Sequence, residues 1–349
     1  MPQFSDKDRI FMQRALELAE LGRVSVSPNP MVGCVVVHND MIIGEGWHRK
    51  YGESHAEVNA ISIVEDKSLL EECTVYVTLE PCSHYGKTPP CSDLLIEKKV
   101  KKVIVATQDS NPLVGGKGIA KLKETGIEVE LGLMKEEASK LNRRFFTAIN
   151  KKRPYIILKW AQTHDAFIAR EDYDSKWISN DYSRKLVHKW RTEEDAIMVG
   201  TNTARYDNPQ LNARQWQGKN PVRIVLDKNL SLNQDLNLFD GSQPTLCYNL
   251  LKSEKNGVDY IQIREETVLQ QIMDDLNDRH IQSIIVEGGA HLLNSFIEKN
   301  LWDEARIFTA PVTFGKGINA PNVTGKVQSV EFIDQDELKI IINEQNQFQ

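Results

Sequence analysis

The sequence has few cysteines, no long apolar run and no excess of positive charge. Five cysteines in 349 residues, an odd and sparse number, argue against a disulfide framework, so we expect reduced thiols that are available as metal ligands. No stretch approaches the roughly 20 apolar residues that cross a bilayer. The formal net charge of −6 disfavours a general nucleic-acid binder, which carries a basic excess. These absences predict a protein with neither a membrane nor a nucleic acid as partner.

The N-terminal segment, residues 1–22, predicts an amphipathic helix rather than a signal peptide, because charges run through all of it. Ser5 is suited to cap the start of this helix and Gly22 to end it. The predicted apolar face consists of Ile10, Phe11, Ala15, Leu16, Leu18 and Ala19. Without a targeting segment, we expect a cytoplasmic protein.

The length of the chain predicts two domains, since 349 residues exceed one compact core of typical size. In the first half, strand-like segments at 31–37, 41–47, 74–80 and 101–107 alternate with helix-like segments at 55–64 and 91–99. This alternation is typical of a mixed α/β layer structure. The first two strands flank the turn-prone residues 38–40, which predicts a hairpin.

Near residue 150 the local composition changes. In NKKRPYIILKWA, three basic residues and a proline precede a new apolar segment that predicts a strand. We place a domain boundary at residues 146–153, which gives domains 1–148 and 149–349. Strand-like segments at 155–161, 196–200, 222–227 and 283–289 then alternate with helical ones. Gly288 and Gly289 follow the last of these, where they suit either a phosphate at a helix N-terminus or close packing. Because Gly-x-Gly-x-x-Gly is absent, a dinucleotide site here must be built differently.

A histidine and two cysteines have the spacing of a zinc site. His55 lies in the stretch ESHAEVNAI, and a His-x-Glu triplet alone is most often a solvated helix end. The stretch LEPCSHYGKTPPC at residues 79–91 adds Cys82 and Cys91. Three protein ligands leave the fourth tetrahedral position open, as in catalytic zinc sites, whereas a structural site takes a fourth side chain. Cys73 and His84 are the candidates for such a fourth ligand.

The neighbouring residues suit proton transfer at this site. We expect both His55 and Cys82 at helix starts, where the dipole and free N–H groups favour a thiolate. Zinc lowers the pKa of a bound water towards about 7. Glu57 can then take the proton and pass it to a leaving amine. His-x-Glu followed by Pro-Cys and a second Cys is the arrangement of the zinc deaminases.

Eight residues separate Cys82 from Cys91, and this long insert contains Gly and Pro. Together with SPNPMVGCVVV and GEGWHRKYGESHAE, it resembles the deaminase half of the bifunctional riboflavin-biosynthesis deaminase–reductase family over about residues 5–150. The resemblance implies a cytidine-deaminase-like α/β/α domain in which His55, Cys82 and Cys91 bind Zn²⁺ and Glu57 shuttles protons. It also implies substrate contacts at Asn29, His48, His84 and Lys87. By their residue types alone, Asn29 could be a turn residue and His48 and Lys87 could be solvated.

The second half resembles the reductase half of the same family over about residues 154–320, through KWAQTHDAFIA, SKWIS, DAIMVGTNTARYDNPQLNAR and VEGG. That half is similar in fold to dihydrofolate reductase and uses NADPH. The resemblance implies cofactor contacts at Ala161, Trp177, Thr203, Asp207, Gly289, Ala290, His291, Leu292, Leu293, Asn294 and Ser295. It implies substrate contacts at Ser175, Arg191, Leu211, Arg214 and Glu287. Arg191 and Arg214 suit a phosphate, while Trp177 suits either a ring contact or core packing.

The resemblance implies two consecutive reactions on a small phosphorylated pyrimidine. The first is hydrolytic deamination of a cyclic amidine, 2,5-diamino-6-(5-phosphoribosylamino)pyrimidin-4(3H)-one. The second is NADPH reduction of the ribosyl group, which gives 5-amino-6-(5-phosphoribitylamino)uracil. The family's tendency to self-associate implies a homo-oligomer. No side chain in the sequence is assigned as the proton donor of the reduction, and no basic residue is assigned to the 2′-phosphate.

One departure favours an alternative in which only the deaminase is active. The family has Gly after the Asp at position 165, whereas Ala166 stands here and has less access to positive φ. The segment FGKGINAP at 314–321 also matches the family's sequence pattern less closely than the other segments do. Two further alternatives are a zinc deaminase acting on a nucleic acid such as tRNA, and a binding protein with a structural zinc and a degenerate second domain.

Overall fold

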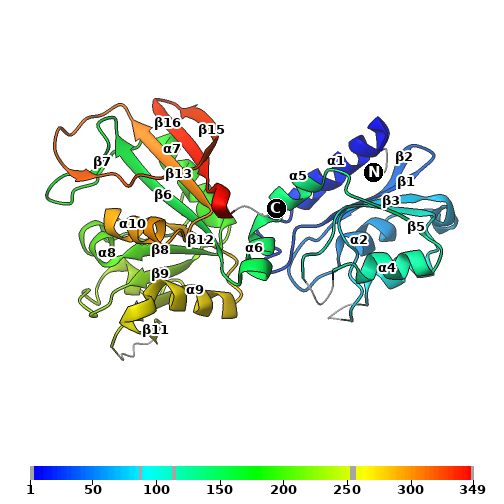
Figure 1. The fold of residues 1–349 in the computed structure, drawn as a ribbon, viewed down its shortest axis with the longest axis horizontal. Helices are drawn as coiled ribbons and strands as arrows, with labels where there is room; N and C mark the ends of the chain where they lie inside the picture. Colours follow the sequence, from blue (N-terminus) through cyan, green and yellow to red (C-terminus); the bar gives the residue numbers. More distant parts are fainter. Residues whose placement is uncertain (1–3, 86–88, 112–114, 252–256, 347–349) are drawn as a thin grey trace. The chain divides into compact units, whose positions relative to one another are not determined.

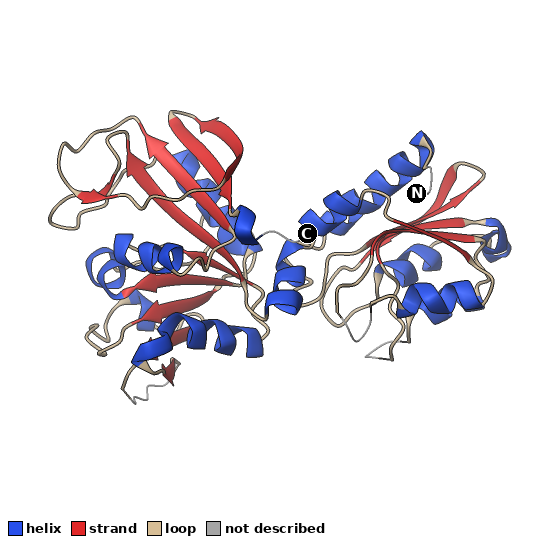
Figure 2. Cartoon of the chain, viewed as in Figure 1, coloured by secondary structure: helices blue, strands red, loops and turns tan. Residues whose placement is uncertain are grey.

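The computed structural model describes residues 4–85, 89–111, 115–251 and 257–346. The chain divides into two compact units, Met1–Lys151 and Lys152–Gln349, each of which has its own sheet and helices (Figures 1 and 2). The division follows helix α6 (Arg143–Lys151), whereas the boundary predicted between residues 148 and 149 lies inside that helix. Within the described residues, no helix is both long enough and apolar enough to span a membrane.

The sheet of the first unit has five strands in the order β2-β1-β3-β4-β5. β1 (Gly33–His38) and β2 (Met41–Trp47) form the predicted hairpin, and β1 also pairs antiparallel with β3 (Thr74–Leu79). β3, β4 (Lys102–Thr107) and β5 (Glu128–Leu131) are parallel. The carboxyl end of β3 leads directly into the segment that contains two of the predicted metal ligands, Cys82 and Cys91.

Helices cover both faces of this sheet, because alternate strand residues face opposite sides. α1 (Asp6–Glu20) and α5 (Lys135–Leu141) pack against strand residues such as Val35, Tyr76 and Ile104. α2 (Ala56–Ser62), α3 (Cys91–Glu97) and α4 (Lys117–Glu124) cover the opposite face; a short 3₁₀ helix, Lys67–Glu72, lies between α2 and β3. The predicted α/β/α layering is therefore confirmed.

Helix α1 has the predicted start. The Ser5 hydroxyl accepts from the Asp8 N–H at 3.2 Å, and the Asp8 carboxylate accepts from the Ser5 N–H at 2.8 Å, which completes a capping box. One predicted core residue is wrong, because Ile10 is 65% exposed and Met12 is fully buried instead. At 3.6 residues per turn, the buried stripe is centred on residues 11, 12, 15, 16 and 19, and Ile10 lies outside it.

The second unit contains a nine-stranded sheet in the order β11-β10-β9-β8-β12-β6-β13-β16-β15. The strands from β11 to β13 are parallel, and β16 and β15 extend the sheet antiparallel. In chain order their bounds are β6 (Tyr155–Thr163), β8 (Ala196–Gly200), β9 (Val222–Leu226), β10 (Thr245–Asn249), β11 (Asp259–Gln262), β12 (Ser283–Val286), β13 (Glu304–Ala310), β15 (Lys326–Ile333) and β16 (Asp336–Ile342). A small separate pair joins β7 (Phe167–Ala169) to β14 (Ile318–Asn319).

Helices again lie on both faces of the sheet. α7 (Asp181–Glu193) and α8 (Thr201–Asp207) pack on one face, and α9 (Val268–Asp278) and α10 (Ala290–Glu298) pack on the other. Three 3₁₀ turns, Asn237–Phe239, Glu265–Thr267 and Glu344–Asn346, complete the unit. α8 follows β8 directly and α10 follows β12 through a Gly-Gly pair, so both helices start at the carboxyl edge of the parallel strands (Figure 1). Ligands of open α/β sheets bind at this edge.

Candidate functional site

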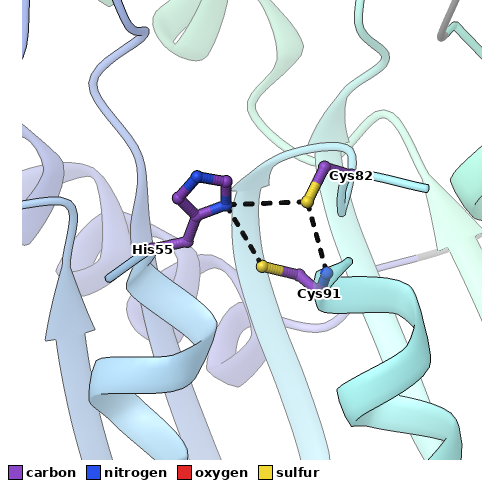
Figure 3. Close-up of side chains that lie close together, drawn as sticks. All are labelled: His55, Cys82 and Cys91. Carbon is purple, nitrogen blue, oxygen red and sulfur yellow. Dashed lines mark hydrogen bonds between the residues drawn. The ribbon is translucent and has the colours of Figure 1, made fainter. Parts of the chain in front are cut away.

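His55, Cys82 and Cys91 converge in the first unit as predicted (Figure 3). His55 precedes α2, Cys82 lies in the loop after β3, and Cys91 begins α3. The His55 Nδ1 atom lies 3.5 Å from the Cys82 Sγ atom and 3.3 Å from the Cys91 Sγ atom. Tetrahedral zinc with ordinary Zn–S and Zn–N bonds separates such atoms by about 3.6 Å. The donor types and their spacing therefore fit zinc.

The prediction that Cys82 starts a helix is wrong. Pro89 and Pro90 precede α3, and proline disfavours helix in the residue before it, so the helix begins only at Cys91. The Cys91 backbone N–H donates to the Cys82 Sγ atom at 3.2 Å. Hydrogen bonds from the Cys91 thiol and from His55 hold the pKa of the Cys82 thiol well below its usual range. A thiolate ready to bind a metal is thus stabilised by the next ligand in the chain.

Neither candidate for a fourth protein ligand joins this cluster. Cys73 is buried, and its thiol donates to the Leu69 carbonyl at 3.1 Å. His84 is exposed. Among the residues that the structure describes, the group of possible ligands consists of His55 and the two cysteines. This arrangement matches a catalytic rather than a closed structural site.

Glu57 lies two residues after His55 on the first turn of α2 and is 3% exposed. Burial, together with the nearby Cys82, raises the pKa of its carboxyl to about 7. Burying a carboxylate costs free energy unless it is paired or hydrogen-bonded, and a raised pKa reduces that cost by favouring the neutral, protonated form.

Asn29 and His48 lie beside the cluster. The His48 Nδ1–H donates to the Ser54 carbonyl at 3.1 Å, so its Nε2 atom accepts from the Asn29 amide at 3.0 Å. The rings of His48 and His55 meet edge to face, with centroids 5.4 Å apart. His48 is buried, which contradicts the solvated alternative, and burial lowers its pKa. Lys87 lies outside the described residues.

A cavity of about 1060 Å³ opens in the second unit at the carboxyl edge of β9, β8, β12 and β6. Most of the predicted cofactor and substrate positions line it: Ala161, Ser175, Trp177, Arg191, Thr203, Asp207, Leu211, Arg214, Glu287, Gly289, Ala290, His291 and Leu292. Leu293 lies on the buried face of α10, and Asn294 and Ser295 are not among the lining residues. The sequence motifs scattered over residues 161–292 thus meet around one cavity.

The Gly-Gly turn before α10 is held tightly. The Gly289 N–H donates to the Thr203 hydroxyl at 2.8 Å, which ties α8 to this turn. A Cβ atom at Gly288 would lie 2.9 Å from the Leu292 Cδ2 atom and 3.0 Å from its Cβ atom. A side chain at position 288 would therefore crowd Leu292, and both glycines line the cavity.

The loop between β7 and α7 supplies another wall. The Ser175 hydroxyl donates to the Asp207 carboxylate at 3.2 Å, and Tyr173 stacks on Tyr206 with ring centroids 4.5 Å apart. Trp177 is 68% exposed and has the Arg184 guanidinium 4.6 Å from its ring centroid. The core-packing alternative for Trp177 is thus wrong, and its indole is available to a ligand.

A charged group of three side chains lies at the β6–β12 end of the cavity. The Glu287 carboxylate accepts from Arg191 at 2.8 and 3.1 Å and pairs with the Lys159 Nζ atom at 3.8 Å. Burial alone would raise the pKa of Glu287, but the charges of Arg191 and Lys159 outweigh it and lower the pKa to about 2. Burial lowers the pKa of Lys159, and Glu287 opposes that shift. Arg191 also donates to the Asn212 carbonyl at 3.1 Å, so its guanidinium is largely engaged within the protein.

Lys159 and His188 are among the cavity residues that sequence reasoning missed. The His188 Nδ1–H donates to the Asn212 carbonyl at 2.9 Å, and burial together with Arg191 and Arg214 lowers its pKa to about 4. The only sequence signal for Lys159 is a cation inside the apolar run YIILKWA. His188 lies on an amphipathic helix and carries no local signal.

Ala166, which replaces the glycine of the family pattern, does not line the cavity. Ala166 has φ of +60°, is exposed, and lies in the turn between β6 and β7. Its N–H donates to the Thr163 carbonyl and its carbonyl accepts from the Ala320 N–H. It is not among the residues that line the cavity, so the expected loss of a cofactor contact at this position has no support in the structure.

Comparisons with known proteins cover both units. The model of the "Cytidine and deoxycytidylate deaminase zinc-binding region" matches residues 5–107, and that of the "RibD C-terminal domain" matches residues 154–344. The chain is 42% identical over 320 residues to the riboflavin biosynthesis protein RibD of Aquifex aeolicus, covering 89% of each chain. It is 42% identical over 340 residues to that of Actinobacillus pleuropneumoniae, covering 94% of this chain and 89% of the relative.

Two solved structures have the same fold over nearly the whole chain. RibD of Acinetobacter baumannii has a TM-score of 0.88 and 35% identity, covering 96% of this chain and 98% of that one. A Thermotoga maritima protein named as a diaminohydroxyphosphoribosylaminopyrimidine deaminase/5-amino-6-(5-phosphoribosylamino)uracil reductase has a TM-score of 0.89 and 37% identity, with coverage of 97% and 99%. These likenesses confirm the predicted pairing of a cytidine-deaminase-like domain with a reductase domain.

Proposed function

Because the chain belongs to the RibD family of riboflavin-biosynthesis enzymes, we propose that it carries out both reactions of that family with the residues described above. It is a bifunctional enzyme, a zinc-dependent deaminase and an NADPH-dependent reductase. The proposed substrate of the first reaction is 2,5-diamino-6-(5-phosphoribosylamino)pyrimidin-4(3H)-one, and the product of the second is 5-amino-6-(5-phosphoribitylamino)uracil. The observation that carries the deaminase assignment is the three-ligand cluster with a buried glutamate beside it.

In the deaminase unit, His55, Cys82 and Cys91 would hold zinc and leave one position for water. When bound, zinc supplies a Lewis acid that lowers the pKa of a water to near 7. Glu57 accepts the proton of the attacking water and delivers it to the amino group that leaves as ammonia. Its burial excludes bulk water, so the proton stays within the site.

Asn29 and His48 position the pyrimidine in this proposal. The hydrogen bond from Asn29 to His48, and from His48 to the Ser54 carbonyl, fixes both side chains next to His55. The remaining carbonyl oxygen of the Asn29 amide is an acceptor that suits an N–H or amino group of the ring. His84 is exposed near this site and suits the more distant ribose phosphate.

In the reductase unit, the cavity wall formed by Ala161, Trp177, Thr203, Asp207 and the start of α10 would hold NADPH. The cofactor supplies the hydride for the ribose C1′ carbon. As C1′ gains hydride, its bond to the ring oxygen breaks, and that oxygen takes up a proton. Lys159 is the proposed proton donor, because it lines the cavity and its pairing with Glu287 favours the charged ammonium form.

Several observations support an active reductase over the deaminase-only alternative. The Ala166 departure lies outside the cavity wall, and the Lys159–Glu287–Arg191 group is intact. The structural-zinc alternative is disfavoured by the open three-ligand cluster. The acidic net charge disfavours a nucleic-acid substrate, so the proposed partner is the small phosphorylated pyrimidine alone.

We also propose a cytoplasmic homo-oligomer. Val330 and Phe332 lie on one face of the edge strand β15 and are 48% and 71% exposed. Exposed apolar side chains on a sheet edge suit pairing with a second chain. Sedimentation equilibrium of the wild type and of Phe332→Lys tests this, since a monomeric wild type would contradict self-association.

The direct test of the two activities is incubation of the zinc-loaded protein with the diaminopyrimidinone phosphate, with and without NADPH. Ammonia release without NADPH, followed by NADPH oxidation, is the expected result. Ammonia release without any oxidation of added NADPH would support the deaminase-only alternative. Neither activity in a protein with bound zinc would favour the binding-protein alternative.

A further inference from the structure

The metal ligand Cys82 lies in a loop and is held from two sides. From α3, the Ser92 N–H donates to the Cys82 carbonyl at 3.1 Å, and the Cys91 N–H donates to the Cys82 Sγ atom at 3.2 Å (Figure 3). On the other side, Cys82 follows Glu80 and Pro81, which come directly after β3. The position of this ligand therefore depends on what fixes Glu80 and Pro81.

The Glu80 side chain is a buried carboxylate, 6% exposed, to which four backbone N–H groups donate. Its Oε1 atom accepts from Gly118 at 2.9 Å and from Ile119 at 3.2 Å. Its Oε2 atom accepts from Gly116 at 2.8 Å and from Asp109 at 3.3 Å. Hydrogen bonds to an ionised acceptor are stronger than neutral ones and offset the cost of burying the charge. Both oxygens are thus used to join the end of β3 to the start of α4.

Glu80 supplies the cap that α4 lacks in its own sequence. The helix begins after Gly116, which has no side chain to accept from the first turn. The first four N–H groups of a helix have no partner within it and carry partial positive charge. The Glu80 carboxylate accepts from three of these groups. Loss of its charge would therefore loosen the start of α4.

The start of α4 also packs against the backbone next to Cys82. A Cβ atom at Gly118 would lie 2.0 Å from the Pro81 carbonyl oxygen, so a side chain there would force the helix and Pro81 apart. Pro81 is the residue before Cys82. The hydrogen bonds of Glu80 and this close contact together fix the backbone that carries the metal ligand.

We propose that Glu80 is a positioning residue of the deaminase, which clamps the Pro81–Cys82 segment to α4 and so holds the Cys82 thiol where zinc binds. The inference rests on the proposed zinc-dependent deamination. Among the described residues, Glu80 is not a member of the group of possible metal ligands, and its oxygens are engaged by backbone N–H groups. It therefore sets how tightly the site holds zinc and takes no part in the proton transfer.

The test is zinc affinity, measured by competition with a chelator on the full chain and on Glu80→Gln, below the melting temperature of both. The carboxamide has the same shape, but its NH₂ group would face backbone N–H donors and cannot accept from them. Loss of a residue that orients a metal ligand weakens metal binding about 10- to 100-fold, and we expect this loss in the variant. Excess zinc should restore ammonia release to near the wild-type rate, because Glu80 does not act on the reaction.

A second variant disturbs the same contact and leaves the carboxylate in place. The added Cβ atom of Gly118→Ala would push α4 away from Pro81, so zinc affinity should fall in this variant too. If Glu80→Gln does not fold, Gly118→Ala decides the question.

Two controls separate this effect from charge and from stability. Glu124→Gln changes an exposed carboxylate on the same helix and should keep the wild-type zinc affinity. Leu70→Ala removes a fully buried side chain of the same hydrophobic core, outside α4, and lowers the melting temperature without touching the clamp. Below its melting temperature it should also bind zinc as the wild type does.

Several results would overturn the role of Glu80. Wild-type zinc affinity in Glu80→Gln or in Gly118→Ala would show that the clamp does not hold the ligand. An equal loss of affinity in Leu70→Ala would show that stability alone sets it. A low rate of ammonia release that excess zinc does not restore would show that Glu80 acts on the reaction. The proposed function fails separately: a zinc-loaded wild type that releases no ammonia would contradict the deaminase, while the zinc affinities would still decide the role of Glu80.

Discussion

Glu287→Gln probes the reductase cavity most sharply, because it removes a charge and keeps the shape of the side chain. The carboxylate is 12% exposed and lies between Arg191, at 2.8 Å, and Lys159, at 3.8 Å. Removing one partner of a buried ion pair leaves an uncompensated charge and costs about 3–5 kcal/mol. The carboxamide still accepts one bond from Arg191, so we expect the lower end, about 3 kcal/mol, in the free energy of unfolding of this unit. Urea unfolding of the full chain measures it.

The pH dependence of this loss has a definite sign. The pKa of Glu287 is lowered to about 2, so its charge stabilises the fold above the ordinary range of a glutamate. That stabilisation is lost as the pH falls toward 2. The difference in stability between the wild type and Glu287→Gln should therefore be complete at neutral pH and shrink in acid.

The same substitution also tests Lys159 as the proton donor. Burial lowers the pKa of Lys159 and Glu287 opposes this, so the variant should have a still lower Lys159 pKa. The rate of NADPH oxidation should then decline at a lower pH on the alkaline side than in the wild type. Glu298→Gln, which changes an exposed carboxylate at the end of α10, is the control and should alter neither property. A stability change below about 1 kcal/mol together with an unmoved alkaline limb would refute the reasoning.

Three other substitutions give separate tests. Ala166→Gly should raise the free energy of unfolding by about 0.5–1 kcal/mol in urea titrations. The reason is that relief of about 1–2 kcal/mol of strain in the left-handed backbone conformation exceeds the entropy cost of glycine. A lower free energy of unfolding in the variant would show that Ala166 is not strained. Gly288→Ala should lower stability by about 1–3 kcal/mol and weaken NADP⁺ binding in calorimetry, because its Cβ atom would lie 2.9 Å from Leu292; wild-type values would show that the turn has room. Cys82→Ser should lose zinc, as measured by metal analysis after dialysis, whereas Cys73→Ser should keep it; equal zinc in both would contradict the ligand assignment.

The sequence predicts the metal cluster because zinc restricts both the ligand types and their number. His55, Cys82 and Cys91 could be named from spacing and residue type, and the structure brings them together. The apolar runs at 31–37, 74–80 and 283–289 likewise predict strands, since strands buried on both faces are nearly continuous in apolar residues. These features depend on local chemistry or local pattern.

The features that could not be predicted depend on contacts between distant segments. Lys159 acquires its role from Glu287, which lies more than a hundred residues away in the chain and directly after the neighbouring strand β12. The helix predicted at 91–99 is present as α3, which begins at Cys91, whereas the helix start expected at Cys82 is wrong because Cys82 lies in the loop before it.

The central claim is that Glu57 moves the proton of a zinc-dependent deamination. The most direct measurement is ammonia release from the diaminopyrimidinone phosphate by Glu57→Gln, with bound zinc quantified in the same preparation. The carboxamide has nearly the same shape but cannot exchange a proton, so zinc should remain at the wild-type level while ammonia release is lost. Ammonia release at the wild-type rate with zinc in place would contradict the account.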